Sequence, residues 1–202
     1  SSIRTGRSCV ADMVELPFAA HIATLPAASE SAALLIVEVG YTALATVMAR
    51  RDQDIALARR LGQVQDDNAN LCIEDASGVF VPTGPGAWLF TSKGKGDVVE
   101  ALAMRLTGMA SVFDQSSGYG ILRLSGPFAR TLISKGAFID FDMLAFPIGR
   151  AAVTVIEHID VTLWRTGEDS FEIAVFRSTA ASFWHWLIQS CAASGIQPSR
   201  AI

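Results

Sequence analysis

The order of predicted elements repeats once along the chain, and this repeat constrains the fold more than any single motif. Residues 39–109 predict a strand, a helix, two strands and a helix, at 41–49, 52–61, 78–81, 87–90 and 97–106. Residues 110–196 predict strands and helices in a similar order, at 119–124, after Pro127, and at 151–156, 161–165, 171–176 and 179–193. Helices in both halves stop at glycines 62, 108, 136 and 195, which indicates an internal duplication.

Helices that recur between short antiparallel strands favour an α+β fold. We expect two pseudo-repeated ferredoxin-like (split βαβ) halves, 39–109 and 110–196, within a single α+β domain over residues 39–202. Residues 1–38 have little periodicity and contain Pro17 and Pro26, so they predict an extended N-terminal arm. A Ser-Gly turn signal before the strand at 119–124 predicts a positive φ at Gly118.

Charge argues against a nucleic-acid partner. Only 18% of the 202 residues are charged, 50% are hydrophobic, and the formal net charge is -4. The chain also has no basic run that could follow a phosphate backbone. We therefore expect neither DNA nor RNA binding.

Cysteine spacing and hydropathy favour a cytoplasmic protein. Cys9, Cys72 and Cys191 lie far apart and form no Cys-x-x-Cys pair, so the sequence predicts neither a zinc site nor a redox pair. The apolar run at 32–37 is much shorter than the roughly 20 residues of a spanning helix. We expect no membrane segment and no export.

No pattern predicts catalytic, cofactor-binding or metal-binding residues. His21, His158 and His185 have no partner at metal-site spacing, and Ser125 suits a helix cap better than a nucleophile. The glycine runs at 84–86 and 94–96 do not complete a phosphate loop. The acid pairs at 66–67, 140/142 and 168–169 lie in predicted turns.

The last predicted helix has more apolar surface than one core contact requires. At 100° per residue, its apolar side chains from Trp186 round to Ile188 span about 200°, whereas a surface helix needs little more than ~100°. This width predicts that Trp184 or Trp186 faces outward and that Phe183, Trp184, Trp186 and Leu187 form a partner interface. In the alternative, the N-terminal arm folds back over this face.

A series of motifs in order resembles the gamma subunit family of heterotetrameric sarcosine oxidase. The motifs include Asp-Gln-Ser-Ser-Gly at 114–118, Leu-Ser-Gly-Pro at 124–127, Lys-Gly at 135–136, Ala-Phe-Pro-Ile-Gly at 145–149, and the segments 158–165, 171–178 and 182–187. The resemblance is strongest over residues 110–195 and weaker over 40–108. It implies a fold similar to the N-terminal part of the folate-binding aminomethyltransferase.

The resemblance also implies partners and chemistry. It implies a cytoplasmic bacterial complex of alpha, beta, gamma and delta subunits that oxidises sarcosine to glycine. FAD, FMN, NAD, zinc and the tetrahydrofolate site are then expected in the partner subunits and none in this chain. Gamma is expected to be a non-catalytic structural subunit that is inactive when isolated.

Two alternatives remain open from the residues. One is a gamma-like subunit of a related N-methyl amine oxidoreductase, for example one that acts on N-methylglutamate. The other is a stand-alone folate-binding protein, with a pterin pocket drawn from Trp88, Arg123, Trp164 and Arg165.

Overall fold

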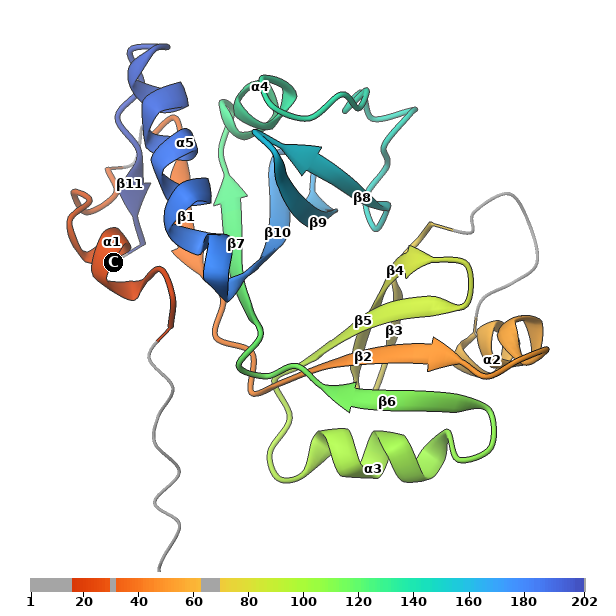
Figure 1. Cartoon of the computed structure of the whole chain (residues 1–202). Helices are drawn as coiled ribbons and strands as arrows, with labels where there is room; N and C mark the ends of the chain where they lie inside the picture. The colour runs from red at the N-terminus through yellow and green to blue at the C-terminus, as the bar shows by residue number, and fades with distance from the viewer. Residues whose placement is uncertain (1–15, 30–31, 63–69, 202) are drawn as a thin grey trace, which may run out of the picture.

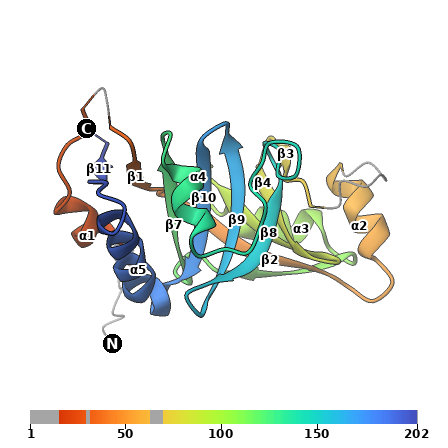
Figure 2. The same cartoon turned by 90° about the horizontal axis from the view of Figure 1, so that it is seen from above.

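Two largely antiparallel sheets organise the protein (Figures 1 and 2). The computed structural model describes residues 16–29, 32–62 and 70–201. Helices pack on both sheets, so the predicted α+β class is confirmed.

The first sheet contains the first of the two repeats. Its strands are β2 (Ala43–Ala49), β3 (Ile73–Asp75), β4 (Gly78–Gly84), β5 (Ala87–Ser92) and β6 (Ala110–Asp114), in the order β3-β4-β5-β2-β6. Two helices, α2 (Asp54–Leu61) and α3 (Val98–Arg105), bury Leu57 and Leu102 against Val47 and Phe90 of the sheet. The succession β2-α2-β4-β5-α3-β6 is a split βαβ unit, as predicted.

The second sheet repeats this plan with two additions. Its strands are β1 (Leu35–Glu38), β7 (Tyr119–Ser125), β8 (Ala151–Ile156), β9 (Ile159–Gly167), β10 (Ser170–Phe176) and β11 (Ser199–Arg200), in the order β11-β1-β7-β10-β9-β8. The helices are α4 (Ala129–Ser134) and α5 (Ala180–Ala192), preceded by a 3₁₀ turn over Arg177–Thr179. The repeat is β7-α4-β9-β10-α5-β11, with β8 added at one edge and β1 inserted between β7 and β11.

This topology shifts the predicted boundaries. Strand β6 completes the first sheet, although its residues were predicted to begin the second half. Strand β11 extends the second sheet beyond residue 196, and β1 joins that sheet from the N-terminal side. The two halves therefore meet between residues 114 and 119.

The extended-arm prediction for residues 1–38 is wrong over much of the described part. A short helix, α1 (Ala19–Ala23), precedes β1, which pairs with β7 from Leu35 opposite Ser125 to Glu38 opposite Leu122. Phe18 is completely buried in the core of the second sheet. Residues 1–15 and 30–31 lie outside the described residues. The N-terminal segment is thus part of the core and of the strand pairing of the second sheet.

Glu38 joins this segment to β1. Both oxygens of its carboxylate accept the backbone N–H of Phe18, at 3.0 and 3.1 Å. Burial raises the pKa of Glu38 from 4.5 to about 7, and the Phe18 hydrogen bond and the charge of Arg177 offset this only in part. The carboxyl group is therefore harder to ionise when the segment is docked.

The turn at 115–118 joins the two sheets. The N–H of Gln115 donates to the carbonyl of Leu44 at 2.8 Å, and Ser116 Oγ accepts the N–H of Leu44 at 3.2 Å. Gly118 does not have the predicted positive φ. It instead allows a close approach, because an added Cβ would lie 2.6 Å from Oε1 of Gln115.

We predict that Gly120→Ala destabilises the protein by about 1 to 3 kcal/mol. A Cβ at Gly120 would lie 2.5 Å from Cγ of Pro17 and 2.7 Å from Cε2 of Phe18. The N-terminal segment must then shift, which should also speed its proteolysis. Urea unfolding measures the first effect, with Gly40→Ala as the control because no atom lies within 4 Å there. Equal stabilities of the two variants would contradict the docked segment.

We also predict that the contribution of Glu38 to stability falls as pH rises from 4.5 to about 7. In this window the folded state holds a proton on Glu38 that the unfolded state has released, so raising the pH favours unfolding. Below pH 4.5 both states are protonated and the penalty is absent. The free energy of unfolding, measured against pH, should fall less steeply in Glu38→Gln than in the wild type. Parallel curves would show that Glu38 does not titrate in this window.

Candidate functional site

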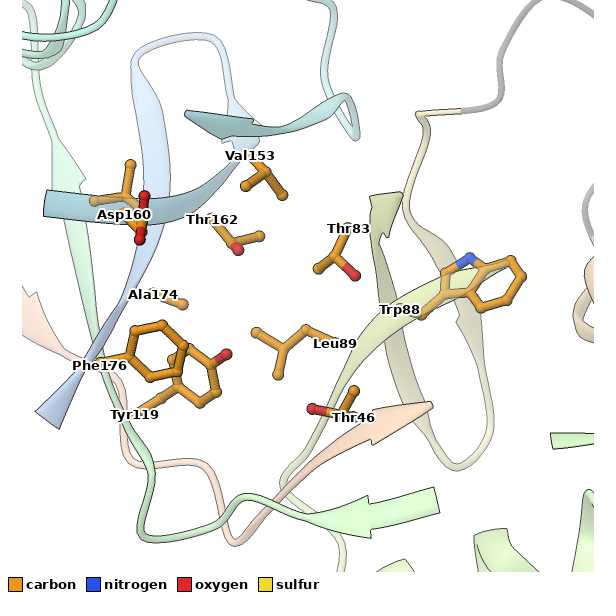
Figure 3. Close-up of a pocket in the computed structure, with 11 residues that line it drawn as sticks. Thr46, Thr83, Trp88, Leu89, Tyr119, Val153, Asp160, Thr162, Ala174 and Phe176 are labelled. Atoms are coloured by element: carbon orange, nitrogen blue, oxygen red, sulfur yellow. The ribbon is translucent and has the colours of Figure 1, made fainter. Parts of the chain in front are cut away.

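A cavity of about 290 Å³ lies between the two sheets (Figure 3). Thr46 and Leu89 line it from the first sheet, and Thr162 and Ala174 face them from the second. The rings of Tyr119 and Phe176, which also line it, stack with centroids 4.7 Å apart. Asp160 is the only charged side chain among the described residues that line the cavity. The chemistry of the cavity is therefore that of hydroxyl groups, apolar walls and one carboxylate.

A layer of buried side chains packs the two sheets together beside this cavity. It is formed by Val39, Leu44, Val81, Leu89, Ile121, Ala151, Trp164 and Ala174. Backbone hydrogen bonds join the sheets a second time, from Cys72 N–H to the Gly149 carbonyl and from Ala151 N–H to the Asn70 carbonyl, both at 2.7 Å. These contacts limit the space between the sheets.

A buried carboxylate lies on the face of the second sheet that turns toward the first. The side chain of Glu172 is 1% exposed. Its Oε1 accepts hydrogen bonds from Nε of Arg123 at 2.9 Å and from Nη2 of the same guanidinium. Its Oε2 accepts the hydroxyl of Tyr41 at 2.7 Å. Burial and the neighbouring Glu172 carboxylate raise the pKa of Tyr41 well above 10, which keeps the phenol as a hydrogen-bond donor.

This network has a structural character. Arg123 lies opposite Glu172 in the second sheet, and Tyr41 belongs to the connection between β1 and β2. The hydrogen bonds therefore fasten the crossing between the sheets.

The described cysteines do not have the properties of nucleophiles. Burial, followed by the charge of Glu172, raises the pKa of Cys72 to about 12. Burial also raises the pKa of Cys191 to about 11. A reactive cysteine needs a lowered pKa, because the thiolate is the attacking form. Cys9 lies outside the described residues.

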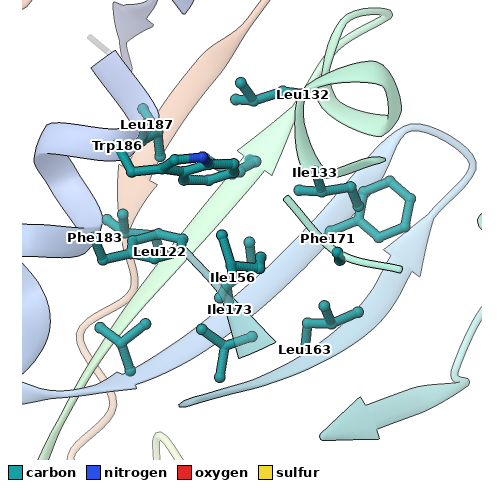
Figure 4. Packing of buried hydrophobic residues seen from close by; sticks show 14 of the residues in the cluster. Leu122, Leu132, Ile133, Ile156, Leu163, Phe171, Ile173, Phe183, Trp186 and Leu187 are labelled. Atoms are coloured by element: carbon teal, nitrogen blue, oxygen red, sulfur yellow. The ribbon is translucent and has the colours of Figure 1, made fainter. Parts of the chain in front are cut away.

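The predicted outward face of the last helix is wrong (Figure 4). Phe183 and Leu187 are fully buried, and Trp184 and Trp186 are only 8% and 9% exposed. Trp186 packs over the second sheet, and a Cβ at Gly136 would lie 2.6 Å from its Cζ2 atom. The surplus of exposed aromatic surface on which the partner-interface assignment rested is therefore absent.

The N-terminal segment covers the other tryptophan of this helix, Trp184. The ring of His21 stacks on the indole of Trp184, with ring centroids 5.5 Å apart. The ring centroid of Phe18 lies 6.2 Å from that of the same indole. The wide apolar arc is thus shared between the sheet and the segment around α1. This is the alternative in which the N-terminal residues fold back over the helix.

The structure separates one of the three histidines from the other two. His21 stacks on Trp184. His158, in the turn between β8 and β9, and His185, exposed on α5, both line an open groove beside Trp186. No group of three or more His, Cys, Asp or Glu residues in the described part of the chain could hold a metal ion. Ser125 is the last residue of β7, and α4 begins at Ala129 without a side-chain cap, so the predicted capping role of Ser125 is wrong.

Of the four side chains considered for a folate pocket, Trp88 alone is among the described residues that line the cavity between the sheets. Arg123 is paired with Glu172, and Arg165 donates to backbone carbonyls in the core. Trp164 packs between the sheets, on the face of β9 opposite to Arg165. The indole of Trp88 is turned away from the other side chains around the cavity in Figure 3. The structure does not assemble them into a pterin pocket.

A family model described as the sarcosine oxidase gamma subunit family matches residues 70–193. The chain belongs to this family. It is 30% identical over 185 residues to sarcosine oxidase subunit gamma of Corynebacterium sp. (strain U-96), a match that covers 82% of this chain and 88% of that one. Over 108 residues, it is 33% identical to sarcosine oxidase subunit gamma of Arthrobacter sp., covering 53% of each chain.

Solved structures show the same relationship. A chain of the heterotetrameric sarcosine oxidase from Corynebacterium sp. U-96 in complex with pyrrole 2-carboxylate aligns with a TM-score of 0.74 and 28% identity. The alignment covers 88% of this family member and 94% of that chain. Aminomethyltransferase T of the glycine cleavage system from Bartonella henselae aligns with a TM-score of 0.55 and 16% identity, over 83% of this chain and 48% of that one. This second likeness shows the fold alone, and it agrees with the predicted fold.

Among the described residues, no helix has both the length and the apolar character required to cross a membrane.

We predict that Arg123→Met destabilises the protein by about 3 kcal/mol or more, because it leaves the Glu172 carboxylate buried without its cation. Arg123→Met/Glu172→Met should be more stable than the single variant, since the unpaired charge is removed as well. Urea unfolding of the two single variants and the double variant gives the coupling energy. Additive losses would show that the two side chains do not stabilise each other.

Proposed function

We propose that this chain is the gamma subunit of a heterotetrameric sarcosine oxidase and acts there as an assembly subunit that holds no cofactor. The alignment with one chain of the solved heterotetrameric enzyme carries the proposal, because it extends over 94% of that chain. The alpha, beta and delta subunits are its proposed partners, and the cytoplasm is its proposed location.

The proposed reaction belongs to the assembly as a whole. Sarcosine is oxidatively demethylated to glycine, and oxygen is reduced to hydrogen peroxide. The methyl carbon is either passed to tetrahydrofolate or released, after hydrolysis, as formaldehyde. FAD, FMN, NAD and zinc are assigned to the partner subunits.

The cavity between the sheets supports a role without a bound dinucleotide. At about 290 Å³, it is at the lower limit of ordinary ligand pockets. A flavin or nicotinamide dinucleotide also carries phosphates, and these require cations or a helix N-terminus. The only charge that lines this cavity, within the described residues, is the carboxylate of Asp160. The residues present do not fit such a cofactor.

The buried nucleophile candidates support the same role. Cys72 and Cys191 have raised pKa values, and Tyr41 is held as a hydrogen-bond donor to Glu172. Glu172, Arg123 and Tyr41 are engaged with one another. We therefore assign the contribution of this chain to the stability and arrangement of the partner subunits.

Coexpression with and without this chain tests the proposal. We predict that all four chains copurify as a yellow complex, and that omission of this chain lowers the yield of assembled complex and its thermal midpoint. Flavin absorbance, mass spectrometry and sarcosine-dependent peroxide formation measure the result. A complex of alpha, beta and delta with full stability and turnover would contradict the assembly role. Faster turnover of N-methylglutamate than of sarcosine would instead assign the chain to a related N-methyl amine oxidoreductase.

A further inference from the structure

The segment between α4 and β8 exposes large apolar side chains. It runs over residues 137–149 at the periphery of the second sheet (Figure 1). Phe138 is fully exposed and Leu144 is 95% exposed, while Phe141 and Phe146 of the same segment are buried. The segment therefore has an inner surface, which contains the two buried phenylalanines, and an outer surface, which contains Phe138 and Leu144.

The inner surface is fixed by Arg165, whose side chain is almost completely buried. Its Nη1 atom donates to the carbonyl of Phe141 at 3.2 Å and to that of Phe146 at 2.8 Å. The guanidinium lies 5.0 Å from the ring centroid of Phe171, and Phe141 packs edge-on against both Phe146 and Phe171. The segment is therefore held in place by charge-assisted hydrogen bonds and aromatic packing.

Two aspartates hold the outer surface in a defined turn. An oxygen of Asp140 accepts the N–H of Asp142 at 2.9 Å, and an oxygen of Asp142 accepts the N–H of Leu144 at 2.9 Å. Both aspartates are exposed. Phe138 and Leu144 thus project from an ordered segment, with two carboxylates between them in the sequence.

Such a surface matches the properties of a binding hot spot. An ordered segment loses little conformational freedom on binding, so more of the apolar burial appears as affinity. Charge complementarity with the two carboxylates requires basic groups around the pocket that receives the apolar side chains. A symmetric contact between two copies of this segment would instead place the same carboxylates against each other. The expected occupant is therefore a different chain.

We propose that Phe138 and Leu144 insert into an apolar pocket, bordered by lysine or arginine side chains, on one of the partner subunits. This inference rests on the proposed function, because it identifies the surface through which the chain joins the heterotetramer. It replaces the face of α5 as the principal contact.

The test compares Phe138→Ser/Leu144→Ser with the control Ile55→Ser/Met104→Ser. The control removes two exposed apolar side chains, 54% and 65% exposed, from helices on the other sheet. Neither change should alter the thermal midpoint of the free chain by much, since exposed substitutions have small effects on stability. We expect the first variant to bind the complex of alpha, beta and delta about 30-fold or more weakly than the wild type, and the control to bind like the wild type.

A second variant tests the charge. Asp140→Asn/Asp142→Asn keeps the side-chain oxygens that accept the backbone N–H groups but removes both charges. We expect a slower association rate and a smaller dependence of that rate on salt. An unchanged rate and salt dependence would overturn the basic border of the proposed pocket.

The outcomes separate this inference from the proposed function. If the wild type joins the heterotetramer and Phe138→Ser/Leu144→Ser joins it equally tightly, the docking surface is wrong and the proposed function stands. If the isolated wild-type chain forms dimers and this variant does not, the occupant of the surface is a second copy and the inference is overturned. If the wild type does not bind alpha, beta and delta, both proposals fail.

Discussion

The hydrogen-bond network of the buried Glu172 carboxylate holds the connection between the two halves against the second sheet. Glu172 lies in the middle of β10, Arg123 lies opposite it on β7, and Tyr41 reaches it from the connection into the first sheet. A carboxylate that is 1% exposed cannot be left without partners, because the cost of burying an unpaired charge is several kcal/mol. The second sheet and the connection between the sheets must therefore form together.

The same constraint explains which parts of the fold the sequence predicts. The end of α2 at Gly62 and the hairpins from β8 to β10 are set by local residue patterns. The sequence therefore predicts these elements correctly. Strand β1 depends on pairing with β7, which lies far away in the sequence, and β11 has only two residues. Local periodicity does not contain such pairings, so an apolar stretch before residue 39 resembles an arm although it occupies the interior of a sheet.

Predictions about the site fail for a related reason. The helical wheel correctly indicates that α5 packs on two sides, but it cannot identify the second layer as Phe18 and His21 of the same chain. Nor can composition distinguish Phe141, which packs inward, from Phe138, which is exposed. Arg165 binds the backbone carbonyl groups of Phe141 and Phe146 on the inner side of the segment, and no motif in the sequence marks Arg165 as a buried cation.

The packing between the sheets also restricts where function can lie. The apolar layer that includes Leu44, Ile121 and Trp164 joins the two halves and leaves a cavity of about 290 Å³ with a single carboxylate. Enlarging that cavity to receive a dinucleotide would remove the contacts that hold the sheets together. The contacts that join the halves occupy most of the space between the sheets. A binding function of this chain is therefore expected on its surface. Exposure of the Phe138 and Leu144 side chains to water is energetically unfavourable. Their burial against a partner would remove this cost.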